Sequence, residues 1–164
     1  MPTKLDKILP KLHDEGYKFL VIFAFATIIL YFINGFLGFI GLLLTVWCYY
    51  FFRDPERFSI NDETFLISPA DGVVSQIAEV KGPQELGLEN KQFTRISIFM
   101  NVFDCHVNRF PSSGKIDKIF YKPGKYLNAS LDKSSDENER NYIKMTNSHG
   151  DDLVLVQIAG LIAR

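Results

Sequence analysis

Residues Phe19 to Phe52 read FLVIFAFATIILYFINGFLGFIGLLLTVWCYYFF, and this run determines the architecture of the chain. Its 34 positions contain no charged residue, whereas the rest of the 164-residue sequence is mixed and polar. A membrane-spanning helix needs about 20 predominantly apolar residues, so the run is long enough for more than one apolar helix. The chain therefore has an apolar front and a water-soluble remainder.

The apolar run is too long for a single membrane helix. One helix of this length would extend about 50 Å, against a hydrocarbon core of about 30 Å. Asn34 and Gly35 lie in the middle of the run, and both residue types favour turns. We therefore expect a helical hairpin with arms Phe19–Ile33 and Phe36–Phe52, which either just crosses a bilayer or dips into it from one side.

Basic residues flank the run on both sides. Four lysines precede it, and Arg53 and Arg57 follow it. Because positive residues favour the cytoplasmic side of a membrane, both ends of the hairpin are expected there. Hydrophobic residues from Leu5 to Leu12 follow helical spacing between the lysines, which is typical of an amphipathic helix on an anionic membrane surface.

Two other interpretations of the apolar run remain open. Ala24-Phe-Ala26 imitates the cleavage site of a signal peptide, although the run continues far beyond it. The two arms would also be compatible with a buried helix pair in a soluble protein. A membrane hairpin explains the length, the central break and the basic flanks together.

The composition excludes several classes of function. The formal net charge is -1, whereas nucleic-acid binding demands a basic patch, so no nucleic-acid partner is expected. The two cysteines, Cys48 and Cys105, form no CxxC pattern, which argues against a disulfide framework or a thiolate zinc site. The sequence also lacks a Gly-rich phosphate loop, an HExxH motif and metal-ligand spacing, and we predict no metal.

Beyond Glu63, short apolar runs alternate with turn residues, which predicts strands and hairpins. The sequence Asn147 to Gly150 predicts a turn between the last two strands. Short strands at this spacing predict a mainly β fold, an antiparallel β-barrel or sandwich preceded by an N-terminal α-helical membrane hairpin. The expected strands are Val73–Val80, Phe93–Phe103, Lys115–Tyr121, Tyr142–Thr146 and Leu153–Ala163.

The final segment, Leu153 to Arg164, is strongly apolar and ends abruptly. A β domain normally closes with its last strand paired, so we expect the chain to be truncated and its partner strands to be missing. We assign residues 1–57 to the amphipathic helix and membrane hairpin. Residues 58–164 are assigned to an incomplete β-rich domain.

Two polar motifs accompany the predicted strands. Ser68–Gly72 precedes a strand and contains an Asp-Gly pair, which is most often simple turn chemistry. Asp104–Arg109 follows a strand and gathers a carboxylate, a thiol, an imidazole and a guanidinium. A thiol mechanism is disfavoured, because Cys105 and His106 would point to opposite faces of an extended strand.

Six short segments together resemble the phosphatidylserine decarboxylase family, particularly its short bacterial form. They occur in family order and cover nearly the whole chain from the apolar hairpin onward. The segments are Phe51-Phe-Arg-Asp-Pro-Glu-Arg57, Ser68-Pro-Ala-Asp-Gly72, Phe103-Asp-Cys-His-Val-Asn-Arg-Phe-Pro111, Tyr121-Lys-Pro-Gly124, Glu137-Asn-Glu-Arg-Asn141 and Gln157-Ile-Ala-Gly-Leu-Ile-Ala-Arg164.

The resemblance implies a pyruvoyl-dependent carboxy-lyase of phospholipid biosynthesis, which converts phosphatidylserine to phosphatidylethanolamine. In this family a proenzyme, or zymogen, cleaves itself at a Gly-Ser bond near its C-terminus, and the serine becomes a pyruvoyl group on a small alpha subunit. That carbonyl forms a Schiff base with the substrate amine and withdraws electrons as carbon dioxide leaves. This chain would be the larger beta-subunit portion, on the cytoplasmic face of the bacterial inner membrane.

The resemblance also assigns site residues. Asp71 matches the aspartate of the family's self-cleavage triad, and His106 matches a histidine of the active-site loop, so both are expected to be catalytic. Some members carry a second histidine three positions later, where this chain has Arg109, which we assign to substrate binding. The base of self-cleavage therefore stays open: His106 serves either as both base and proton donor or as proton donor alone.

The sequence contains no serine that matches the Gly-Ser motif. The pyruvoyl group is therefore expected from a Ser absent from this chain, which would be inactive by itself. Expected partners are an anionic phospholipid membrane, phosphatidylserine, the small pyruvoyl subunit and further copies in a homo-oligomer. The rival interpretation is a non-catalytic, membrane-anchored, lipoyl-like β-barrel adaptor, in which Asp71 and His106 would have no reason to share a cavity.

Overall fold

The computed structural model describes residues 9–60, 62–128 and 137–163. The first eight residues of the chain, which hold part of the predicted amphipathic helix, lie outside this description. The chain forms two compact units, and each is described by itself. The first unit comprises Met1–Ser59, Pro69–Gly72 and Met100–Arg109, and the second comprises Ile60–Ser68, Val73–Phe99 and Phe110–Arg164.

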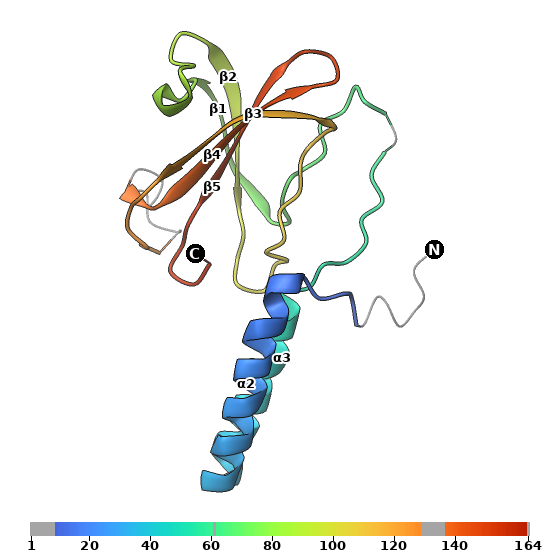
Figure 1. Cartoon of the computed structure of the whole chain (residues 1–164), viewed down its shortest axis with the longest axis vertical. Helices are drawn as coiled ribbons and strands as arrows, with labels where there is room; N and C mark the ends of the chain where they lie inside the picture. Colours follow the sequence, from blue (N-terminus) through green and yellow to red (C-terminus); the bar gives the residue numbers. More distant parts are fainter. Residues whose placement is uncertain (1–8, 61, 129–136, 164) are drawn as a thin grey trace. The chain divides into compact units, whose positions relative to one another are not determined.

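Two antiparallel helices, α2 (Asp14–Ile33) and α3 (Gly35–Phe51), lie side by side in the first unit (Figure 1). Asn34 separates them, because its backbone is extended and interrupts the helical path. Its side-chain oxygen accepts a hydrogen bond from the Phe36 N–H at 2.8 Å and so caps the start of α3. The predicted break in the apolar run is therefore confirmed.

Small residues let the two helices approach closely. A Cβ atom added to Gly38 would lie 2.7 Å from the backbone of Tyr31, and one added to Gly41 would lie 2.8 Å from the Thr27 hydroxyl. The hydroxyl groups of Thr27 and Thr45 form a hydrogen bond between the helices at 2.9 Å. The helix pair is thus held by close backbone packing and one interhelical polar contact.

The outward faces of both helices are apolar and exposed. Gly16 is the only buried residue of α2, and Phe32 near its end is 83% exposed. Helix α2 is long and apolar enough to cross a membrane, whereas α3 is shorter, at 17 residues. The helical N-terminus is therefore confirmed, while insertion of both helices as a hairpin stays a prediction.

A short backbone pairing closes the polar end of the helix pair. Leu12, before α2, and Arg53, after α3, form an antiparallel bridge. Leu12, Cys48 and Phe51 are buried at this end. The residues that enter and leave the helix pair are therefore joined by backbone pairing. The segments Pro69–Gly72 and Met100–Arg109 belong to the same unit.

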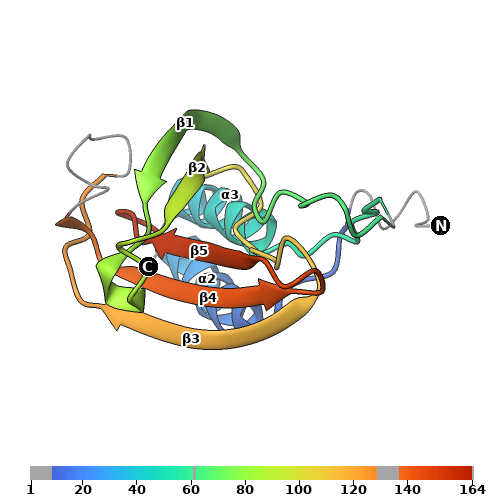
Figure 2. The same ribbon diagram turned by 90° about the horizontal axis from the view of Figure 1, so that it is seen from above.

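The second unit is built from five described strands in two antiparallel sheets (Figure 2). β1 (Val73–Lys81) pairs with β2 (Gln92–Phe99). In the other sheet, β4 (Arg140–Asn147) lies between β3 (Gly114–Lys122) and β5 (Asp152–Ile158). The mainly β, antiparallel class is confirmed, whereas closure into a barrel or sandwich stays a prediction.

The predicted hairpin near the C-terminal end is confirmed as β4 and β5. Its turn contains Gly150 at φ 86°, a left-handed conformation that favours glycine. β5 ends at Ile158, earlier than the predicted Ala163, because the chain turns after this point. The turn is marked by a hydrogen bond from the Gly160 N–H to the Ala163 carbonyl at 2.7 Å.

The second unit has a small apolar core. The 3-10 turn η1 (Gln84–Leu86) contributes Leu86, which is buried with Leu88 and with Tyr142 of β4. Phe93 of β2 packs against this cluster and joins the two-stranded hairpin to it. Only some of the apolar side chains of these strands are therefore buried in this core.

Candidate active site

The loop Met100–Arg109 begins where β2 ends. The strand stops at Phe99, earlier than the predicted Phe103, because a turn at Asn101 redirects the chain. The Asn101 side-chain oxygen accepts a hydrogen bond from the Phe103 N–H at 2.8 Å, and the Asp104 carboxylate accepts one from the Asn101 N–H at 2.9 Å. Such local bonds are typical of Asn and Asp in turns, and they shape the loop before its histidine.

Three side-chain hydrogen bonds tie this loop to α3 and to Arg53, which follows it. The Trp47 indole N–H donates to the Val102 carbonyl at 3.0 Å. The Arg53 guanidinium donates to the Phe103 carbonyl at 3.1 Å, and the Cys105 thiol donates to the Arg53 carbonyl at 2.9 Å. The loop is therefore fixed to the chain immediately after the apolar run.

His106 occupies a half-buried position on this loop. Its ring stacks on Phe51, with the ring centres 4.0 Å apart and the planes 17° from parallel. Nδ1 lies 3.0 Å from the Asp104 carbonyl oxygen. Because a carbonyl oxygen only accepts, Nδ1 carries the proton and donates, which leaves Nε2 as the basic nitrogen. Among the described residues, Nε2 has no hydrogen-bond partner.

The surroundings of His106 keep its imidazole neutral. Burial lowers its pKa below the ordinary value of 6.5, and the positive charge of Arg53 acts in the same direction. The hydrogen bond to the Asp104 carbonyl and the charge of the Asp104 carboxylate oppose this lowering. The net result is an unprotonated Nε2 at neutral pH, which is the form that a general base requires.

Asp71 lies in the segment Pro69–Gly72, which belongs to the same compact unit as His106. It precedes Gly72, whose φ of 148° is rarely adopted by residues with a side chain. The Asp71 carboxylate forms an ion pair with the Arg57 guanidinium. Within the described part of the chain, no hydrogen bond joins Asp71 directly to His106.

Arg109 connects the two loops to the segment that follows α3. Its backbone N–H donates to the Pro69 carbonyl at 2.8 Å. One guanidinium nitrogen contacts the Asp54 carboxylate and donates to the Pro55 carbonyl at 2.8 Å. The structure therefore brings the three predicted site residues into one compact unit, although their roles stay predictions.

Residues 44–164 match the family model described as phosphatidylserine decarboxylase. A protein of Pelagibacter ubique strain HTCC1062, named phosphatidylserine decarboxylase proenzyme, is 68% identical over 160 residues, which cover 98% of this chain and 74% of the relative. This chain belongs to the phosphatidylserine decarboxylase family. Proenzymes of the same name from Ruegeria pomeroyi and Cereibacter sphaeroides are 54% and 52% identical, over 97% and 98% of this chain and 73% and 69% of their own lengths.

Membership of the phosphatidylserine decarboxylase family confirms the resemblance drawn from the six segments. It also confirms the predicted class of enzyme, because the family is one of carboxy-lyases. The matched region corresponds to the N-terminal part of these relatives. All three relatives are named as decarboxylase proenzymes, so the alternative of a non-catalytic adaptor has no support among them.

The charged residues that follow α3 in this decarboxylase-family chain were not predicted to belong to the site. The segment containing them was recognised, but Arg53 and Arg57 were interpreted only as basic flanks of the apolar run, and no role was given to Asp54. In the structure each of them reaches a site loop: Arg53 bonds the histidine loop, Asp54 pairs with Arg109, and Arg57 pairs with Asp71. The available signal was alternating charge directly after an apolar helix.

Proposed function

We propose that this chain forms the membrane-anchored, histidine-bearing part of a phosphatidylserine decarboxylase, which converts phosphatidylserine to phosphatidylethanolamine and carbon dioxide. The observation that carries the proposal is the state of His106, a neutral imidazole with an available Nε2 on a loop bonded to the end of an apolar helix. A base in this position would meet a lipid headgroup while the acyl chains stay in the bilayer.

The family implies a pyruvoyl group, made from a serine that is not in this sequence and carried by a small alpha subunit. The histidine loop fits such a group, because the half-buried His106 offers one unprotonated ring nitrogen that can accept a proton. When bound, the pyruvoyl group would supply an electron sink for the electron pair that is left on the α-carbon of the substrate as carbon dioxide leaves.

The residues of this chain hold and move protons around that chemistry. His106 accepts a proton at Nε2 and returns it, while the Asp104 carbonyl keeps the other ring proton in place. Asp71 supplies the carboxylate needed in self-cleavage, and Arg57 fixes its orientation. Arg109 binds the carboxylate of the substrate with guanidinium N–H groups that its own ion pair leaves available.

The helix pair anchors this site to a lipid bilayer. Exposed apolar side chains on α2 and α3, the absence of charge from Phe19 to Phe52, and basic residues at both ends support a hairpin inserted from the cytoplasmic face of the cell membrane. At about 30 Å and 26 Å, the two helices have nearly the length of a hydrocarbon core. The hairpin therefore places the polar end of α3, and the loop bonded to it, at the membrane surface.

The test joins this chain to the C-terminal remainder of the Pelagibacter ubique relative and measures the formation of phosphatidylethanolamine from phosphatidylserine. We expect the chimera to cleave itself and to be active. The His106→Ala variant should lose activity by about 100-fold or more, because the general base and acid is removed. The Asp71→Asn variant should stay uncleaved, as seen by mass spectrometry.

His149→Ala is the matched control for this experiment. His149 lies in the turn between β4 and β5 and contacts the Glu63 carbonyl, so its removal changes a histidine outside the proposed site. This variant should retain full activity. Full activity in His106→Ala, or an equal loss in His149→Ala, would contradict the proposed role.

A further inference from the structure

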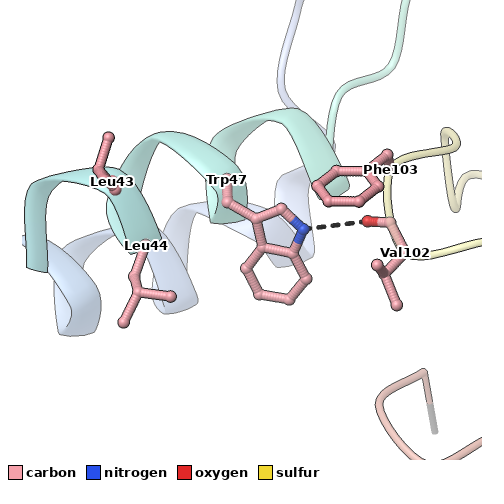
Figure 3. Close-up of a pocket in the computed structure, with 5 residues that line it drawn as sticks. All are labelled: Leu43, Leu44, Trp47, Val102 and Phe103. Atoms are coloured by element: carbon pink, nitrogen blue, oxygen red, sulfur yellow. Dashed lines mark hydrogen bonds between the residues drawn. The ribbon is translucent and has the colours of Figure 1, made fainter. Parts of the chain in front are cut away.

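An apolar groove lies between α3 and the loop that carries His106 (Figure 3). It has a volume of about 400 Å³ and is open over most of its extent. Leu44 and Phe103, from its two walls, are 46% and 73% exposed, so no described residue fills the space. The groove is lined by Leu43, Leu44 and Trp47 of α3 and by Val102 and Phe103 of the loop.

The groove offers an occupant almost nothing to hydrogen-bond. The indole N–H of Trp47 is already donated to the Val102 carbonyl at 3.0 Å, as Figure 3 shows. The Phe103 carbonyl accepts from Arg53 at 3.1 Å. The other walls are hydrocarbon. A polar ligand would lose its bonds to water here without replacement, whereas a hydrocarbon chain loses none.

A cation, Arg53, is bonded to one of the residues that line the groove. Arg53 follows α3 directly, and its guanidinium is held by the carbonyls of Tyr50 and Phe103 at 2.6 and 3.1 Å. Its Nε–H has no partner among the described residues. The Arg53 charge lies close enough to His106 to lower the pKa of that imidazole. Arg53 therefore contacts the groove through Phe103 and also lies near the base, His106.

We propose that this groove seats one acyl chain of an anionic phospholipid, with Arg53 contacting the phosphodiester. The groove, the Arg53 guanidinium and the nearby base match the three parts of such a lipid, namely hydrocarbon chain, negative phosphate and headgroup. The inference rests on the proposed function, since it gives that function a binding site for its lipid. Phe103 and Trp47 are then positioning residues, because they line the groove that holds the acyl chain and lie away from the reacting headgroup.

Trp47 is the only tryptophan of the chain, so its fluorescence reports directly from the groove. The test places the chain in phosphatidylcholine vesicles that contain a minor fraction of lipid with brominated acyl chains, which quench tryptophan on contact. Brominated phosphatidylserine should quench Trp47 about fivefold more than the same amount of brominated phosphatidylcholine, the preference expected from one arginine at an anionic headgroup.

Four variants distinguish binding of a lipid in the groove from simple exposure of Trp47 to the bilayer. Arg53→Gln should abolish the preference for phosphatidylserine, and Arg53→Lys should keep part of it. Leu44→Phe, which narrows the groove, should reduce quenching by brominated phosphatidylserine. Leu42→Phe is its matched control, because Leu42 is similarly exposed on the same helix but does not line the groove.

Equal quenching by the two brominated lipids in the unchanged chain would overturn the proposal, as would equal effects of Leu44→Phe and Leu42→Phe. Lys18→Gln removes a cation from the other helix, α2, and should leave the preference for phosphatidylserine intact. Loss of the preference in this variant would mean that general surface charge causes it, and would overturn the proposal. The fluorescence assay needs no catalysis. An inactive chimera with preserved lipid preference would therefore refute the proposed function alone.

Discussion

His106 shows how one residue receives its chemistry from its neighbours. Phe51 covers one face of the ring, and the Asp104 carbonyl accepts a hydrogen bond from the Nδ1–H group. Burial and the charge of Arg53 lower the pKa, so the neutral form with a basic Nε2 prevails. The same contacts that bury the ring therefore select its tautomer and its charge.

The first prediction concerns the titration of His106. Its pKa, measured by NMR, should lie below 6.5, chiefly because of burial, and Arg53→Gln should raise it, because the charge of Arg53 contributes to the lowering. The folded chain then binds this proton less readily than the unfolded chain. The stability contributed by the neutral imidazole is complete above pH 6.5 and is lost as the pH falls below it.

A non-titrating variant checks the sign of this effect. His106→Phe keeps an aromatic ring that stacks on Phe51 but takes up no proton. Denaturation measured at several pH values should show a smaller loss of stability below pH 6.5 in this variant than in the unchanged chain. A steeper loss in the variant would mean that the imidazole is charged in the folded state.

The residue types of the site were readable from the sequence, but their contacts were not. Asp71, His106 and Arg109 stood out because polar groups followed apolar strands or matched family segments. Asp71 pairs with Arg57 and Arg109 pairs with Asp54, and both partners come from a segment more than ten residues away from either loop. Such pairings depend on how loops meet in space, which local patterns do not encode.

At the scale of elements, the strongest local signals gave the most accurate predictions. Asn34 ends one helix and caps the next, as its turn preference indicates. The end of β2 was predicted four residues too late, because Val102 and Phe103 are apolar. These residues are apolar for a different reason: they face the groove beside α3. Hydrophobicity alone does not distinguish a strand residue from a loop residue that lines an apolar groove.

The second prediction concerns the close packing of α2 and α3. Gly38→Ala should destabilise the helix pair by about 1–3 kcal/mol, because its Cβ would meet the Tyr31 backbone at 2.7 Å. Gly35→Ala is the matched control, since nothing lies within 4 Å of a Cβ at that position. Thermal unfolding in detergent, followed by circular dichroism, should show a lower Tm for the first variant only. Equal Tm values would mean that the helices separate or shift freely.

The division of the chain into two compact units differs from the division that the apolar pattern predicts. The segments Pro69–Gly72 and Met100–Arg109 are interleaved with strands in sequence, yet they group with the helices. A division at residue 57 follows the hydropathy and stays a prediction. The grouping by contacts has a functional consequence, since it makes the polar end of the helix pair the base on which the proposed catalytic loops are built.

The last prediction concerns how the whole chain associates with lipid. If α2 and α3 insert as a hairpin, vesicle-bound chain should resist washing with about 1 M salt, where charges are screened beyond about 3 Å, and should be released only by detergent. Phe25→Asp places a charge in the middle of α2, which costs about 2.5–3.5 kcal/mol in a membrane and should lower the bound fraction. Tyr17→Asp, at the polar end of the same helix, should not. Release by salt would indicate surface attachment only, and a chain that never binds vesicles would favour a soluble helix pair.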